Sequence, residues 1–265
     1  MHTYRARTTS RALASHRLSR IVVRRAGFFH FVSDHHDPFE CLATALNELQ
    51  TRYPDRDIRG SLVVLPEAFN LGSEYHRPDA RPGQETLPAC QARAQLLKIA
   101  QATGILFVAG LLDGGLSSAY WIDPFGPPQL MCHKMGDDRS GNYLPWSGVD
   151  PRNPVHCANA CIGALICVDS LLCATEGTVR ERRGKLLGAL KANSRQYKIL
   201  CIPGHMSSDC MPEVDGVFYI LANSSFQTSF IKDGRKADLV PPPDRRNQIC
   251  LADLSVHEGL DGTDG

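Results

Sequence analysis

Short apolar runs alternate with helix-like stretches in the first half of the chain, and this alternation limits the folds open to it. The segment Ser61–Leu65 carries a continuous Leu-Val-Val-Leu run, as expected of a strand buried on both faces. Before it, Phe39, Leu42, Leu46 and Leu49 recur at helical spacing. Because alternating strands and helices build sheets covered by helices, the pattern predicts an α/β fold.

The first helix has a recognisable start and end. Asp37 is a suitable N-cap because its carboxylate can accept hydrogen bonds from the free N–H groups of the first turn. Pro38 fits the first helical position, and Glu40 stands three residues after the cap. Since proline cannot continue a helix, Pro54 marks the end.

The other elements follow from the same criteria of periodicity and turn residues. We expect strands over residues 20–32, 105–111, 118–123, 129–133, 199–203, 217–222, 229–232 and 248–252, and helices over 86–102 and 176–194. The strands at 118–123 and 129–133 flank Pro-Phe-Gly-Pro and are predicted to form a hairpin. No repeat or linker divides the chain, so one domain with a mixed sheet is predicted over residues 20–255.

The two ends are expected to lie outside this domain. Residues 1–32 contain seven arginines and no Asp or Glu, and we assign residues 1–19 to a basic leader. Two interpretations of the leader remain open, a disordered tail or an organelle-targeting peptide. Residues 256–265 are predicted to form a C-terminal tail.

Composition argues against several classes of partner. The formal net charge of the 265 residues is +1, which gives no global reason to bind nucleic acid. No apolar run approaches the roughly 18 residues that span a bilayer. The ten cysteines follow no secretory signal, so we expect reduced thiols, a reducing compartment such as the cytoplasm, and mostly core positions.

Three apolar strands each end in a reactive side chain. Glu67 follows the strand at 61–65, Lys134 follows the one at 129–133, and Cys167 ends the run Ile-Gly-Ala-Leu-Ile. Sites in open α/β sheets gather beyond the carboxyl ends of strands, where rigid strands hold side chains in place. We therefore expect a carboxylate, an ammonium and a thiol to meet.

Each of these residue types has a chemical part in such a site. A thiol near its unperturbed pKa of about 8.5 is mostly protonated at neutral pH, so it needs a base or a nearby cation. Glu67 can take the proton of Cys167. Lys134 can favour the thiolate and stabilise an oxyanion, and the N–H of Val168 can donate a second hydrogen bond to that oxyanion.

The same residues carry a resemblance to a known family. Leu-Pro-Glu at 65–67 resembles the segment that holds the catalytic glutamate of the carbon–nitrogen hydrolase, or nitrilase, superfamily. His-Lys-Met at 133–135 is similar to its lysine motif, and residues 163–169 are similar to its nucleophile motif, a strand running into Cys, a variable residue and Asp. The strand that ends in Asn223 also matches, so the resemblance covers about residues 20–255.

The resemblance implies a four-layer α-β-β-α sandwich of the nitrilase type and a thiol-dependent hydrolase. It implies cleavage of a non-peptide amide or carbamoyl bond, less often a nitrile, through a thioester on Cys167, with Glu67 and Lys134 as catalytic partners. No metal or organic cofactor is implied. Tyr75, His205 and Asn223 are expected to bind substrate or support the pocket, and the family commonly forms homodimers or larger homo-oligomers.

The chain departs from the family's pattern in three places. Residues 170–176 read Ser-Leu-Leu-Cys-Ala-Thr-Glu in place of the run of Arg, aromatic, Pro and Glu that often follows the nucleophile. No Glu lies between Lys134 and Cys167 where members carry a second one, and Asp137, Asp138 or Asn142 are candidate replacements. Residues 180–198 form a long basic segment that we interpret as an insertion. An alternative is therefore a nitrilase-fold protein with impaired catalysis and a binding or regulatory role.

Other interpretations of the motifs are less favoured. A zinc site would use Cys157, Cys161, Cys167 and Cys173, but their gaps are not those of paired zinc loops. The Asp-His-His-Asp run at 34–37 invites a metal, although Asp37 is better explained as a cap. The Arg-Glu-Arg-Arg run at 180–183 lacks aromatic interleaving for nucleic acid and is interpreted as a solvated surface.

Overall fold

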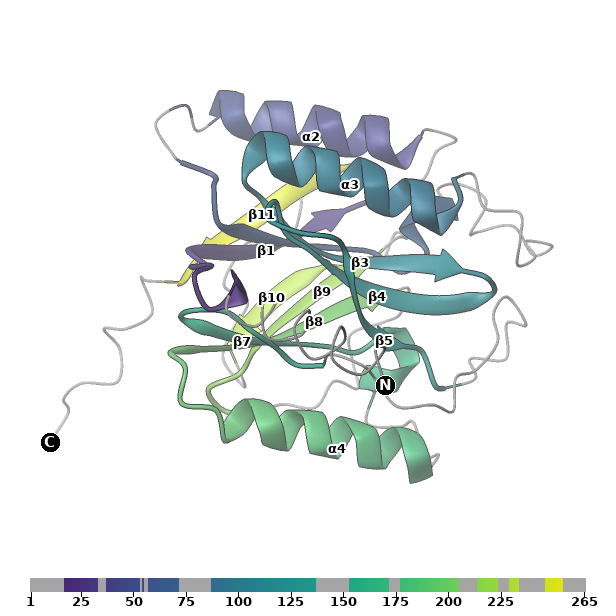
Figure 1. Ribbon diagram of the computed structural model, residues 1–265, viewed down its shortest axis with the longest axis vertical. Helices are drawn as coiled ribbons and strands as arrows, with labels where there is room; N and C mark the ends of the chain where they lie inside the picture. The colour runs from purple at the N-terminus through teal and green to yellow at the C-terminus, as the bar shows by residue number, and fades with distance from the viewer. Residues whose placement is uncertain are drawn as a thin grey trace, which may run out of the picture.

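Two mixed β-sheets pack face to face with helices on both outer sides (Figure 1). The computed structural model describes residues 17–32, 37–52, 54, 57–71, 87–136, 153–171, 177–204, 214–223, 229–233 and 246–254. The layer order is α-β-β-α, which confirms the predicted fold class.

The first sheet has the strand order β11-β1-β2-β3-β4-β5. Its strands are β1 (Arg25–His30), β2 (Ser61–Leu65), β3 (Leu106–Asp113), β4 (Leu116–Ile122), β5 (Gln129–His133) and β11 (Gln248–Asp253). The strands β1, β2 and β3 are parallel, while β4 and β5 continue as antiparallel neighbours. Because β4 and β5 each reverse direction, β5 runs parallel to β2. Glu67 and Lys134 therefore follow strand ends on the same side of the sheet.

The second sheet has the order β10-β9-β8-β7-β6. Its strands are β6 (Val155–His156), β7 (Ala160–Ala164), β8 (Tyr197–Gly204), β9 (Phe218–Asn223) and β10 (Phe230–Asp233). The central strands β7, β8 and β9 run parallel, and the outer strands are antiparallel to them. The Cys167 turn therefore follows the carboxyl end of a central parallel strand.

In the part of the chain that the structure describes, three long helices form the outer layers. In Figure 1, α2 (Pro38–Arg52) and α3 (Ala89–Thr103) lie along the first sheet, and α4 (Gly177–Lys191) lies along the second. The predicted cap is confirmed, because Asp37 Oδ1 accepts hydrogen bonds from the N–H groups of Phe39 at 2.7 Å and Glu40 at 3.3 Å. Gly104 ends α3 with a left-handed φ of 73°.

The core between the sheets is apolar and continuous. It contains side chains from both inner faces, including Val64 and Trp121 from the first sheet and Ile162 and Ile220 from the second. A second cluster lies under α2 and α3 and includes five phenylalanines, among them Phe69 directly after the Glu67 turn. The Glu67 turn is thus held by packing on its outer side.

The sequence-based boundaries need small corrections. Leu18 is already buried in the core and Arg17 pairs with Asp123 at 3.0 Å, so packed structure includes residues before the predicted domain start at 20. The prediction missed β6 and the tight β3–β4 hairpin, whose Gly114 and Gly115 both have positive φ. The other leader residues and the predicted tail lie outside the described part. Within the described ranges, no helix is long and apolar enough to cross a membrane.

Candidate active site

Glu67 and Lys134 form a fully buried ion pair. The Lys134 ammonium lies 2.9 Å from Glu67 Oε1, and neither side chain has any solvent exposure. Removing two charges from water is costly, and the contact offsets that cost only because each charge faces the other at hydrogen-bond distance. The pair also lies beyond the ends of two strands, which is where sites of open α/β sheets gather.

The two oxygens of the Glu67 carboxylate differ in their contacts. Oε1 accepts a second hydrogen bond, at 2.8 Å, from the hydroxyl of Ser117 on β4. Oε2 is buried and has no hydrogen-bond partner among the described residues. Because an ionised carboxylate oxygen has lone pairs that accept hydrogen bonds, Oε2 is available as an acceptor.

Cys167 is presented by a strained turn. It is the first residue of a 3₁₀ turn (Cys167–Ser170) that follows β7, and its φ is +45°. A positive φ is unfavourable for cysteine and persists only where the surroundings impose it. The Ser170 hydroxyl donates a hydrogen bond of 2.7 Å to the Cys167 carbonyl and closes the turn. Sharp strand-to-helix turns of this type are used to expose catalytic nucleophiles.

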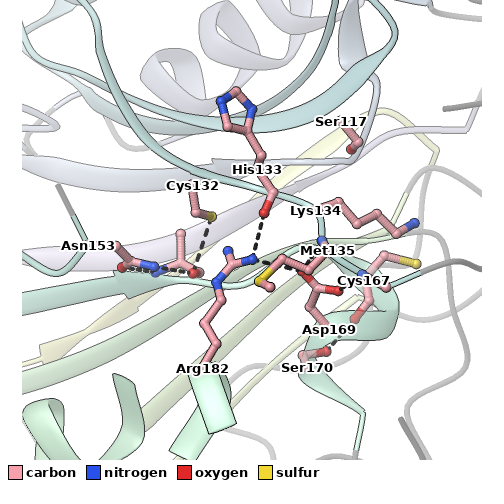
Figure 2. Close-up of polar contacts among 12 residues, drawn as sticks. Ser117, Cys132, His133, Lys134, Met135, Asn153, Cys167, Asp169, Ser170 and Arg182 are labelled. Atoms are coloured by element: carbon pink, nitrogen blue, oxygen red, sulfur yellow. Dashed lines mark hydrogen bonds and ion pairs between the residues drawn. The ribbon is translucent and has the colours of Figure 1, made fainter. Parts of the chain in front are cut away.

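Asp169 joins the cysteine turn to the lysine loop. Its carboxylate accepts hydrogen bonds from the backbone N–H groups of Met135 at 2.8 Å and Gly136 at 2.6 Å. Figure 2 shows the result, in which the side chains of Lys134 and Cys167 extend toward the same side. The convergence expected for these strand ends is thus supported by direct contacts between the two loops.

Arg182 of α4 completes this connection. Its guanidinium donates a hydrogen bond of 2.8 Å to the His133 carbonyl and lies 3.4 Å from Asp169 (Figure 2). Burial raises the pKa of Asp169, while the N–H of Met135, the charge of Arg182 and the N–H of Gly136 oppose that rise.

Part of the basic segment 180–198 is buried rather than solvated. Arg183 is also buried and donates to the Leu171 carbonyl, while Leu186 and Leu190 pack against the second sheet. Over residues 180–191 the segment is the helix layer of the fold, and the surface interpretation of residues 180–183 is wrong for Arg182 and Arg183. Charge alone misled the prediction, since long basic side chains can turn inward to carbonyls and carboxylates.

Gly110 on β3 lets the Glu67 turn approach the second sheet. A Cβ at this position would lie 2.6 Å from the Pro66 carbonyl oxygen, 2.7 Å from Pro203 Cβ and 2.8 Å from Glu67 Cα. Two of these neighbours are backbone atoms and cannot move aside easily. Glycine is thus required where the turn meets the carboxyl end of β8.

Gly110→Ala is expected to displace Glu67. We predict a loss of about 100-fold in turnover from the misplaced carboxylate, with a destabilisation of about 1–3 kcal/mol from overpacking. Turnover and urea unfolding measure the two effects. Gly188→Ala is the matched control, because a Cβ on this exposed face of α4 would meet nothing within 4 Å. It should raise stability by about 0.5–1 kcal/mol without slowing turnover; full activity in Gly110→Ala would contradict the prediction.

Asn70 anchors the segment that follows Glu67. Its side-chain amide donates to the carbonyls of Leu87 and Leu112, each at 3.0 Å, and its Oδ1 accepts the N–H of Leu112 at 2.8 Å. Through its two hydrogen bonds to Leu112, this fully buried side chain connects the segment after Glu67 to the backbone of β3. No role was predicted for Asn70, because an isolated asparagine carries no local signal.

The remaining predicted site residues have different outcomes. Asn223 ends β9 and is buried, and its N–H donates a hydrogen bond of 2.9 Å to the Ser229 hydroxyl, which lies 3.1 Å from His30 Nδ1. Val168 lies within the cysteine turn, as expected for a backbone donor. Its role and that of Asn223 in binding stay predictions. Tyr75, His205, Asp137, Asp138, Asn142 and residues 34–36 lie outside the described part.

Cys157 and Cys161, which precede the nucleophile, are core residues. Burial raises the pKa of Cys157 to about 12 and that of Cys161 to about 11. Both are free thiols, and no cluster of potential metal ligands occurs within the described ranges. Cys173 lies outside those ranges. The raised pKa values leave Cys157 and Cys161 protonated and unreactive near neutral pH.

Solved structures similar to this chain include members of the nitrilase superfamily. A mutant amidase from Nesterenkonia sp. AN1, with acrylamide added to its active-site cysteine, superposes with a TM-score of 0.59 at 17% identity, covering 87% of this chain and 93% of the amidase. Saccharomyces cerevisiae Nit3, a member of branch 10 of the superfamily, gives 0.57 at 17% identity over 89% of this chain and 93% of Nit3. This chain has the nitrilase fold.

Sequence comparison alone does not reach this result. No protein-family model and no curated protein matches the chain. Another mutant of the Nesterenkonia amidase, which carries the acetamide moiety of fluoroacetamide on its active-site cysteine, also superposes, with a TM-score of 0.57 at 17% identity over 87% of this chain and 90% of that one. At this level of identity the nitrilase fold is retained while most side chains differ.

Proposed function

We propose that this protein is a member of the nitrilase superfamily that hydrolyses non-peptide carbon–nitrogen bonds through a thioester on Cys167. The observation that carries the proposal is the buried Glu67–Lys134 pair at 2.9 Å, with the second carboxylate oxygen unpartnered among the described residues. Asp169 supports it by tying the Cys167 turn to the lysine loop. The fold agrees with this activity, since neighbours with 17% identity include amidases with an active-site cysteine.

The first half-reaction is acylation of the thiol. Glu67 takes the proton from Cys167, and the sulfur attacks the carbonyl carbon of the amide. The carbonyl oxygen gains negative charge, which the Lys134 ammonium and the Val168 N–H stabilise. Glu67 then gives its proton to the departing nitrogen, the C–N bond breaks, and a thioester and a free amine or ammonia result.

The second half-reaction releases the acid. Water takes the place of the amine, and Glu67 removes one of its protons as the oxygen attacks the thioester carbonyl. The C–S bond breaks, the sulfur regains a proton and the carboxylic acid leaves. Each atom that moves comes from substrate, water or these side chains, so the proposed reaction uses no cofactor.

The substrate class stays open among small molecules. An ω-amide, an N-carbamoyl amino acid, an aliphatic amide and, less favoured, a nitrile all offer an electrophilic carbon bonded to nitrogen. We further propose, by analogy with the superfamily, that the protein acts as a homodimer or larger homo-oligomer in the cytoplasm. An organelle address read from the arginine-rich leader is the alternative location.

A second candidate is a nitrilase-fold protein without turnover, acting in binding or regulation. The observation that favours it is the altered sequence after Cys167 and the absence of Glu between Lys134 and Cys167. The buried Glu67–Lys134 ion pair argues for the enzyme. Such a pair contributes little net stability to a fold, so catalysis explains its presence better than stability does.

The deciding experiment is a substrate panel with two readouts. Purified protein is incubated with ω-amides, N-carbamoyl amino acids, aliphatic amides and nitriles, and ammonia release and intact mass are followed together. We expect ammonia from at least one member and a transient acyl adduct that maps to Cys167. Binding of a panel member with neither ammonia nor added mass would support the regulatory alternative and overturn the hydrolase.

A further inference from the structure

Ser117 touches both members of the buried pair in two different ways. Its side-chain hydroxyl donates a hydrogen bond of 2.8 Å to Glu67 Oε1. Its backbone carbonyl accepts a hydrogen bond of 2.8 Å from the N–H of Lys134. Both contacts are buried, and Ser117 itself is 1% exposed. One residue of β4 therefore fixes the position of the carboxylate and of the lysine backbone at once.

The consequence is an unequal carboxylate. Oε1 receives the Lys134 ammonium at 2.9 Å and the Ser117 hydroxyl at 2.8 Å, whereas Oε2 receives no donor from the described residues. The two donors on one oxygen fix the plane and direction of the carboxylate, because turning it out of that plane would break both hydrogen bonds in a buried site. The base is thus oriented before any substrate binds.

We infer that Ser117 is a positioning residue of the catalytic site, which holds Glu67 so that Oε2 is the oxygen that exchanges protons with Cys167. This inference rests on the proposed function. It adds Ser117 to the site and assigns different roles to the two carboxylate oxygens of Glu67. In the step concerned, the S–H bond of Cys167 breaks, an O–H bond forms on Oε2, and the sulfur keeps the electron pair. Oε1 stays bound to Lys134 and Ser117 throughout.

The neighbouring Ser118 offers a matched control. It lies next on β4 and is equally buried, yet its hydroxyl contacts His133 Nδ1 at 2.8 Å and the Leu116 carbonyl at 3.2 Å. Successive strand residues point to opposite faces, which explains why adjacent serines serve different partners. Ser117→Ala and Ser118→Ala each remove one buried hydroxyl, but only the first alters the carboxylate.

The test follows the reaction of Cys167 with iodoacetamide as a function of pH, by peptide mass spectrometry. A hydrogen bond donated to a carboxylate stabilises its charged form. Ser117→Ala should therefore move the acidic limb of the alkylation rate upward by about one pH unit. Ser118→Ala should leave the acidic limb at its original pH. Both variants should have a lower free energy of unfolding than the wild type. With a substrate that the wild-type protein hydrolyses, Ser117→Ala should also lower kcat about tenfold and leave KM nearly unchanged.

Two further variants keep the test decisive. Ser117→Thr restores a hydroxyl donor and should return the limb toward its original pH. Ser117→Cys keeps a side chain of similar shape but donates weakly, so it should behave as Ser117→Ala does, and it replaces that variant if alanine prevents folding. The inference would be overturned if the acidic limb of Cys167 alkylation lay at the same pH in Ser117→Ala, Ser117→Cys and Ser118→Ala. Because alkylation needs no substrate, a wild-type protein that releases no ammonia defeats the proposed function without deciding this point.

Discussion

Cys167→Ala should lower amide hydrolysis on the order of 10⁴-fold or more while the fold remains intact. The loss is large because the sulfur forms the covalent intermediate, and no other group can take its place. The small volume change at a 4% exposed position should cost little stability. Ammonia release measures the activity, and thermal unfolding of the same sample shows that the protein is folded.

Selective alkylation tests the same sulfur without a substrate. Iodoacetamide should modify Cys167 faster than the core thiols, because burial raises the pKa of Cys157 and Cys161 and keeps both protonated. Exposed Cys90 gives the background rate of an accessible thiol, and Cys90→Ser should leave labelling of Cys167 unchanged. Slow and uniform labelling of all thiols would speak for a protein without catalysis.

Lys134→Met should be among the most destabilising single substitutions in the chain. Methionine has a similar length, but it leaves the Glu67 carboxylate buried without its cation. Removing one partner of a buried pair typically costs about 3–5 kcal/mol. Urea unfolding of wild type and variant measures the difference. The hydrolysis rate should fall as well, since the oxyanion loses its charged donor.

The double variant separates charge from shape. Glu67→Gln removes the buried charge, so adding it to Lys134→Met should recover part of the lost stability, while activity stays absent. A thermodynamic cycle over the four proteins gives the coupling energy. If Lys134→Met cost less than about 1 kcal/mol, the pair would behave as a solvated surface contact, and the tightly coupled buried site would be refuted.

Local signals explain the part of the fold that was predictable. Asp37 and Pro38 begin α2 as expected, because a cap and a first-turn proline act within a few residues. The predicted strand Ser61–Leu65 has the same bounds as β2. All five residues are buried, so the apolar run marks both ends of the strand. Gly104 closes α3 through a left-handed φ that glycine adopts readily.

The supporting contacts of the site were not predictable. Ser117 reaches Glu67 from 50 positions away, and Asn70, close after Glu67, reaches Leu112 over 42 positions. A single polar residue carries no local pattern that would predict such a contact. Arg182 was misassigned because net charge along a helix does not say which side chains face a carbonyl. Such contacts depend on how β4, β3 and α4 pack against the two turns.

The order of Glu67, Lys134 and Cys167, each after an apolar strand, was written in the sequence, because side-chain chemistry and strand propensity are properties of neighbouring residues. Only the tertiary structure decided that Oε1 is occupied by Lys134 and Ser117, that Oε2 is left without a donor among the described residues, and that Asp169 joins two loops. The physical reason is that hydrogen bonds between remote segments arise when two sheets pack and exclude water, and the register of that packing is set by the whole core.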